Sequence, residues 1–289
     1  MKNFKTTYLK KIATALTLIL SLLTLSLPAA DKMKPEEVIA KHLESIGTPE
    51  ARAAMKSVTI VGTAKATFFG RGGGVAEGIS VVASEGDKYL VAMKFNNPDY
   101  QFEKMGFDAE NFTVGYVRPG QRTALGRILQ DNRGTFERGI MSGVLSTSWE
   151  LLNVDENEAK IKYSGMGKID GKKYHELSYN PKKGSDMSIS LFFDPDTFRH
   201  VRTEYKRVIS SGQGTGVDAS ARLSETRQKL IEDYSDFGAE NNLTLPHTYR
   251  IYLEEISGNG TRSYEWLMNL QKFDFNNDIE DSEFKVDAY

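Results

Sequence analysis

The chain has 289 residues, with 37 basic side chains, 39 acidic side chains and no cysteine. The lack of cysteine excludes disulfides, thiolate nucleophiles and zinc–sulfur sites. The near balance of charge excludes the strongly basic face that nucleic-acid binding requires. The length is ample for one large β-rich domain with its own core.

The first 30 residues have the layout of a secretory signal peptide. Lysines stand at positions 2, 5, 10 and 11, an apolar run covers 12–27, and Pro28, Ala29 and Ala30 follow. This run is short for a bilayer span of roughly 20 residues, which favours cleavage over the alternative of a retained membrane anchor. No cysteine is present at the cut to carry a lipid, so residues 31–289 are expected to be a single exported domain in a bacterial periplasm. Because the leader contains four lysines and no acidic residue, the domain without it is net acidic.

Two helices are predicted at the start of the mature chain. Apolar side chains recur at helical spacing in residues 34–46. Thr48 and Pro49 are typical of an N-cap and first-turn pair, and they predict a short second helix over 48–55.

From residue 58 the apolar period changes to two, which predicts β-strands. A glycine-rich turn at 71–74 and a Gly86-Asp87 turn separate the first strands, and no helical pattern lies between them. Such a run argues for one antiparallel sheet. The predicted strands are 58–69, 75–84, 88–95, 99–107 and 112–117.

The middle of the chain breaks the strand pattern. Residues 123–152 are predicted to form two helices that separate near Asn132 and Gly134. The second is strongly apolar and contains Gly139 and Gly143, although a glycine inside a helix costs about 1 kcal/mol relative to alanine. Such a segment suits a mobile lid and a buried core helix equally well.

Strands resume after this segment and bring the predicted total to ten to twelve. One intervening stretch, 210–224, is rich in Gly, Ser and Ala and is predicted to be a flexible loop. The fold class is therefore α+β, with an antiparallel sheet and two to three helices to cover it. The later strands are 159–166, 173–179, 187–194, 199–209, 227–237, 247–256 and 263–275.

Several strands place large apolar side chains on one face of the sheet, as in the alternation of Tyr264, Trp266 and Met268. An antiparallel sheet with one apolar face must cover that face. Incomplete covering would leave an apolar cavity suited to a lipid. The alternative is an ordinary filled core, and the periodicity alone favours it.

The sequence offers no catalytic constellation. The four histidines, at 42, 175, 200 and 247, lack metal-ligand spacing, and neither a phosphate-binding loop nor a G-x-S-x-G motif is present. The acidic stretch 274–278 lacks the glycine and glutamate of a calcium loop. The basic stretch 199–207 is interpreted as a solvated edge or as paired with acids, and a site for an anionic lipid head group is the alternative. We therefore predict no catalytic residue, no metal and no cofactor.

Five short stretches resemble the LolA/LolB-like superfamily of periplasmic lipoprotein carriers, also called outer-membrane lipoprotein-sorting proteins. They include G-M-G-K-I-D-G-K-K-Y-H-E-L at 165–177 and Y-S-D-F at 234–237; the others are 36–47, 190–201 and 243–247. The turn residues in these stretches mark a fold rather than an active site. In element order, the resemblance covers most of the mature chain.

The resemblance implies a curved sheet, an incomplete β-barrel closed by helices, around a hydrophobic cavity. The expected function is non-enzymatic: a periplasmic carrier or chaperone that holds lipid, or the acyl chains of a lipoprotein, for transport towards the outer membrane. The expected partners are this cargo and inner- and outer-membrane proteins, and the carrier is expected to be a monomer. The candidate cavity residues are Phe136, Ile140, Met141, Val144, Trp149, Leu191, Tyr264, Trp266 and Met268.

Two other functions stay open at this point. The same scaffold would serve a periplasmic sensor or protein-interaction module that engages a partner through a sheet edge or an acidic surface. A secreted hydrolase is the third alternative, although no residues are assigned to it.

Overall fold

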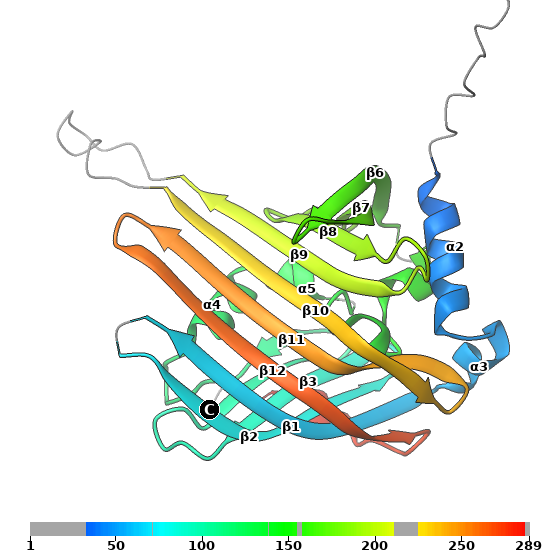
Figure 1. The fold of residues 1–289 in the computed structure, drawn as a ribbon. Helices are drawn as coiled ribbons and strands as arrows, with labels where there is room; N and C mark the ends of the chain where they lie inside the picture. The colour runs from blue at the N-terminus through cyan, green and yellow to red at the C-terminus, as the bar shows by residue number, and fades with distance from the viewer. Residues whose placement is uncertain (1–32, 71, 138, 155–157, 211–224, 287–289) are drawn as a thin grey trace, which may run out of the picture. The chain divides into compact units, whose positions relative to one another are not determined.

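Twelve antiparallel strands form one open, curved sheet in the computed structural model, which describes residues 33–70, 72–137, 139–154, 158–210 and 225–286 (Figure 1). The strand order is β5-β4-β3-β2-β1-β12-β11-β10-β9-β8-β7-β6. The two halves of the chain meet where β1 pairs with β12. The predicted fold class, a curved antiparallel sheet with helices, is confirmed.

The strands are long at the centre of the sheet and short at one edge. In chain order they are β1 Ser57–Phe69, β2 Gly74–Glu85, β3 Lys88–Phe95, β4 Phe102–Phe107, β5 Phe112–Val114, β6 Lys160–Ile169, β7 Lys172–Asn180, β8 Ser188–Phe193, β9 His200–Ile209, β10 Thr226–Glu240, β11 Leu243–Ser257 and β12 Gly260–Phe275.

A β-bulge between Val61 and Gly62 shifts the register of β1 against β12. A bulge bends its strand and increases the local twist, so this one contributes to the curvature at the centre of the sheet. Only glycine fits at position 62, because a Cβ atom there would lie 2.1 Å from the backbone oxygen of Asn269.

The strand order forces the middle of the chain through the hollow of the sheet. Strands β5 and β6 are consecutive in sequence but form opposite edges of the sheet. The chain between them must therefore travel from one edge to the other. Residues 124–152 of this connection, here named the crossing segment, lie inside the hollow behind β10, β11 and β12 (Figure 1).

Helices occupy the ends of the hollow. Helix α2 (Pro35–Ile46) packs on β6, β11 and the crossing segment, and α3 (Pro49–Ala54) follows it with Thr48 as its N-cap. The crossing segment contains α4 (Ala124–Asp131), α5 (Arg133–Phe136) and the 3-10 turns η2 (Gly143–Leu145) and η3 (Glu150–Leu152). A last 3-10 turn, η4 (Asp281–Phe284), lies on the outer face of β3. None of the helices in the described ranges has both the length and the apolarity needed to span a membrane.

The prediction of two helices over 123–152 is wrong in its second half. Regular helix ends at Phe136, and only 3-10 turns follow. Three residues there have left-handed backbone, with φ of +75° at Gly139, +64° at Ser142 and +50° at Gly143. A continuous right-handed helix cannot contain them.

The predicted strand 99–107 is also too long at its start, because β4 begins at Phe102. The predicted leader, residues 1–30, and most of the predicted loop 210–224 lie outside the described residues.

Candidate functional site

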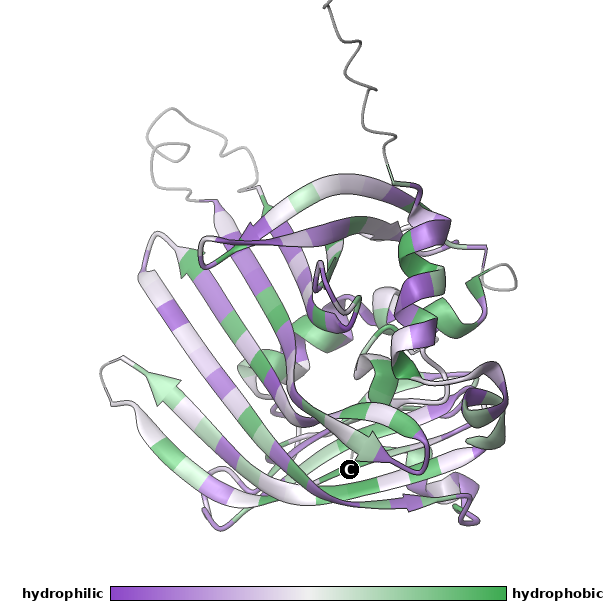
Figure 2. Cartoon of the chain, turned by 45° about the vertical axis from the view of Figure 1, so that its right-hand side comes forward, coloured by the Kyte–Doolittle hydropathy of each residue, from purple (hydrophilic) through white to green (hydrophobic). Residues whose placement is uncertain are grey.

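The inner face of the sheet carries the apolar residues that the strand pattern predicted, and polar residues alternate with them along each ribbon (Figure 2). Trp266 and Met268 on β12 and Leu191 on β8 are at most 1% exposed. Tyr264 is only half-buried and stacks on Trp266 with ring centroids 6.1 Å apart. The four sheet candidates thus point to the hollow.

The other five candidate residues enter the same hollow from the crossing segment. Phe136, Ile140, Met141, Val144 and Trp149 are all buried. Their side chains fill the space above the sheet, and a cavity of about 10 Å³ beside Val144 and Trp149 is small next to even a single water's share of liquid volume. In this structure the crossing segment itself occupies the hollow.

The buried carboxylate of Glu232 anchors the crossing segment to the sheet. Its Oε1 accepts hydrogen bonds from the Tyr249 hydroxyl at 2.5 Å, the Tyr234 hydroxyl at 3.0 Å and the backbone N–H of Ser142 at 2.8 Å. Its Oε2 accepts one from the Tyr205 hydroxyl at 2.6 Å. Glu232 is 0% exposed. Three strands and the crossing segment therefore converge on one side chain.

Burial sets the charge of this cluster. It raises the pKa of Glu232 above the ordinary glutamate value, and the four donated hydrogen bonds oppose that rise. The pKa of each surrounding tyrosine is raised well above its ordinary value, first by burial and then by the nearby carboxylate. The tyrosines are accordingly neutral donors across the physiological range.

A second buried carboxylate, Glu103 on β4, anchors the start of α4. Its Oε1 accepts a hydrogen bond from the Thr123 hydroxyl at 2.7 Å, and its Oε2 accepts one from the Tyr100 hydroxyl at 2.5 Å. The Trp266 indole N–H donates in turn to the Tyr100 hydroxyl at 2.6 Å. This chain of bonds links β12 at the centre of the sheet to the N-cap of α4.

Burial raises the pKa of Glu103 to about 7, against the hydrogen bonds from Tyr100 and Thr123. Because the folded protein holds this proton more tightly than the unfolded chain, Glu103 lowers stability as pH rises from about 4.5 to 7. We expect the stability advantage of Glu103→Gln over the unchanged protein, measured as free energy of unfolding, to be about 3 kcal/mol larger at pH 8 than at pH 4. Urea unfolding of both proteins across this range measures the difference, and a constant difference would contradict the assignment.

Two histidines, His42 on α2 and His200 on β9, form a third set of contacts with the crossing segment. The Trp149 indole N–H donates to Nε2 of His42 at 3.1 Å, and His42 Nδ1 donates to the Phe198 carbonyl at 3.1 Å. Trp149 also stacks on His200, with ring centroids 4.9 Å apart. Burial lowers the pKa of His42 to about 4 and that of His200 well below its ordinary value. Both rings are therefore neutral packing partners at neutral pH.

Hydroxyl pairs hold the crossing segment at two further points. Towards its end, Ser146 Oγ lies 2.9 Å from Ser84 Oγ on β2, and Thr147 Oγ1 lies 2.6 Å from the same atom. In α5, Thr135 Oγ1 lies 2.6 Å from Ser185 Oγ in the turn between β7 and β8. The crossing segment is thus held by side-chain hydrogen bonds rather than by strand pairing.

The carboxylates were missed by the sequence analysis, although the strand period carries a signal for them. Glu232 stands between Leu230 and Tyr234 in the inward phase of β10, and Glu103 shares the inward phase of β4 with Met105. An acid in the apolar phase of a strand predicts a buried, hydrogen-bonded carboxylate. The alternation along one strand cannot predict which hydroxyl groups, distant in sequence, donate to this carboxylate.

The outer face of the same strands is charged and paired. Arg202 and Arg250 both bond to Asp233, at 2.6 and 2.7 Å, and Glu204 accepts from Lys206 at 2.7 Å. The acid-paired alternative for the basic stretch 199–207 is therefore confirmed for Arg202, Lys206 and Arg207, whereas Arg199 lies over the ring of Phe237. Within the described ranges, no three His, Asp or Glu side chains converge as metal ligands would.

Comparison with known proteins gives structural neighbours only: no family model matches the sequence, and no curated protein matches it significantly. The fold is similar to a LolA superfamily protein from Nitrosomonas europaea, at 12% identity over 88% of this chain and 98% of that chain, with a TM-score of 0.47. It is also similar to a putative outer membrane lipoprotein-sorting protein domain from Vibrio parahaemolyticus, at 12% identity over 85% and 97%, with a TM-score of 0.41. A DUF1329 family protein from Desulfovibrio piger matches at 10% identity over 86% and 96%, with a TM-score of 0.39. The structural neighbours thus include the LolA superfamily that the sequence resembles.

Proposed function

We propose that the protein is a non-enzymatic periplasmic carrier whose hollow takes up the acyl chains of a lipid or lipoprotein when the crossing segment moves out. The topology carries this proposal. An open sheet presents a curved apolar face, and the crossing segment that covers its middle is one connection of short helices and 3-10 turns. The crossing segment is therefore able to leave the hollow without breaking any strand pairing.

Uptake of an acyl chain would offset part of the cost of moving the crossing segment out. That movement exposes buried apolar side chains, among them Phe136, Ile140, Met141, Val144 and Trp149, at roughly 2 kcal/mol each. Burying an acyl chain returns roughly 0.8 kcal/mol per CH₂. Because the two contributions have opposite signs, cargo and crossing segment would compete for the same apolar face.

The direct test is mass spectrometry of protein purified gently from the periplasm, together with titration of cis-parinaric acid, a fluorescent fatty acid. The carrier function predicts co-purified lipid or saturable binding. The absence of both would contradict it.

A sharper test locks the crossing segment in place. Ser84 Oγ and Ser146 Oγ are 2.9 Å apart, which is close enough for the double variant Ser84→Cys and Ser146→Cys to form a disulfide. The chain has no other cysteine, so only one intramolecular bridge is available. Oxidation is expected to abolish uptake into the hollow, and reduction is expected to restore it.

The controls for this lock are the two single variants and the reduced double variant. The reduced double variant loses both hydroxyl groups and each single variant loses one of them, in every case without the bridge, so each should keep the uptake of the unchanged protein. Equal uptake by the oxidised and reduced forms would show that cargo does not enter beneath residues 143–147.

A further inference from the structure

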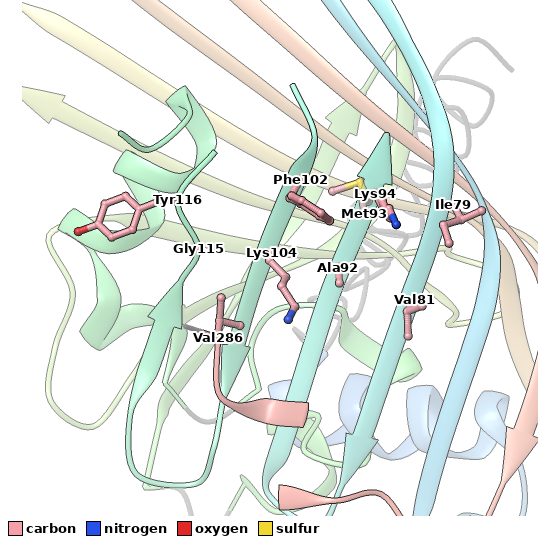
Figure 3. A pocket seen from close by; sticks show the side chains of 10 residues that line it. All are labelled: Ile79, Val81, Ala92, Met93, Lys94, Phe102, Lys104, Gly115, Tyr116 and Val286. Atoms are coloured by element: carbon pink, nitrogen blue, oxygen red, sulfur yellow. The ribbon is translucent and has the colours of Figure 1, made fainter. Parts of the chain in front are cut away.

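A separate apolar groove of about 400 Å³ lies on the outer face of β2, β3 and β4, opposite the hollow (Figure 3). Its apolar lining includes Ile79, Val81, Ala92, Phe102, Tyr116 and Val286. Ile79 is 53% exposed. A volume of this size falls within the range of small-molecule sites, about 300–1,000 Å³. The groove is unlike the outer face around β10, where charged side chains pair with one another.

The sequence creates this groove by placing small residues between larger ones. Ala92 lies in register with Val81 on one side and with Lys104 on the other. At Gly115 a Cβ atom would lie 3.2 Å from Val286 and 3.4 Å from Lys104, so a larger residue would crowd this wall. Phe284 and Val286 pack together with Ala83 and Leu90, which gives the groove a firm end.

Two lysines line the groove from neighbouring strands. Lys94 on β3 lies in register with Ile79 and Phe102, and Lys104 lies in register with Ala92 (Figure 3). Neither ammonium group forms an ion pair with any of the described residues, although other surface lysines such as Lys88 and Lys206 do. Two positive charges with no ion-pair partner among the described residues therefore stand beside an exposed apolar surface.

We propose that this groove binds a long-chain fatty acid, with the hydrocarbon chain along the apolar lining and the carboxylate between Lys94 and Lys104. The charge selects the head group, since an ammonium–carboxylate hydrogen bond is about twice as strong as a neutral one. The apolar lining selects a hydrocarbon chain over a small polar anion. The site is independent of the hollow and stays open when the crossing segment is locked.

The experiment therefore uses the oxidised Ser84→Cys and Ser146→Cys protein, in which the hollow is closed. Titration with cis-parinaric acid is expected to give saturable binding at the groove. The double variant Lys94→Gln and Lys104→Gln, made in the same protein, should weaken this binding at least tenfold. Lys65→Gln is the matched control, because it removes an exposed lysine of β1 that does not line the groove.

The methyl ester of the same acid separates head-group recognition from simple adsorption. The ester should bind the protein that keeps both lysines as weakly as the acid binds the double variant. Replacing the two lysines should not change the affinity for the ester. Equal binding of acid and ester, or no binding to the oxidised protein, would overturn the proposal. These outcomes leave the carrier function untouched, because that function is tested by the difference between the oxidised and reduced forms.

Discussion

Replacing Glu232 with alanine is expected to lower the free energy of unfolding by about 4 kcal/mol. The change leaves three tyrosine hydroxyls and the backbone N–H of Ser142 without their shared acceptor in a dry interior. Each buried donor without a partner costs about 1–3 kcal/mol, and the removal of a buried carboxylate offsets part of this sum. Urea unfolding at neutral pH measures the loss.

Glu232→Gln is the matched control. Its amide oxygen can replace Oε1 as the acceptor for Ser142 and two tyrosines, and its NH₂ group can donate to Tyr205. The Tyr205 hydroxyl already lies 3.4 Å from the Ile140 carbonyl, which is available as its new acceptor. The glutamine variant should therefore stay within about 1 kcal/mol of the unchanged protein.

Hydrogen exchange adds a local readout to the same pair of variants. The amide of Ser142 donates to Glu232 in the folded protein. In the alanine variant this amide and its neighbours in η2 should exchange faster than the amides of β11. Equal stability and exchange in the alanine and glutamine variants would show that Glu232 does not anchor the crossing segment.

The period-two pattern was sufficient to predict the sheet, because inward and outward positions alternate along most of the length of its central strands. In β12, for example, Trp266 and Met268 are buried, whereas Asn269 is exposed. The same pattern cannot predict how strands order themselves. The pairing of β1 with β12 joins residues about 200 positions apart, and it is this pairing that puts β5 and β6 at opposite edges.

The crossing segment shows the limit of periodicity most clearly. Its apolar residues at near-helical spacing predicted a helix, but tertiary contacts decided its backbone. The N–H of Ser142 turns towards Glu232 and the Ile140 carbonyl faces Tyr205, both of which are contacts with the sheet. The glycines at 139 and 143 permit this path. The strand period places the two carboxylates, Glu103 and Glu232, in the inward phase, but it cannot show that they meet the crossing segment.

Trp266→Ala is expected to destabilise the fold by about 3–5 kcal/mol, the usual cost of removing a large aromatic side chain from a core. Trp266 is 1% exposed and lies in register with Ala66 on β1 and Ile251 on β11. The variant also loses the indole N–H that donates to Tyr100.

Trp266→Phe separates these two losses, because phenylalanine keeps most of the ring volume but has no N–H donor. We expect it to cost about 1–2 kcal/mol, mainly for the lost hydrogen bond and the smaller ring. If both variants lost the same stability in urea unfolding, the hydrogen bond to Tyr100, and not the filling of the hollow, would be the main contribution of Trp266.

The phenylalanine variant also reports on the proposed movement of the crossing segment. The chain has two tryptophans, so Trp149 becomes the single indole in this variant. Trp149 lies in the crossing segment, 1% exposed and stacked on His200. If acyl cargo displaces the crossing segment, titration with an unlabelled fatty acid should shift the Trp149 emission to longer wavelength as the indole meets water. An unchanged emission at saturating fatty acid would mean that the segment stays in the hollow, and binding would then be confined to the outer groove.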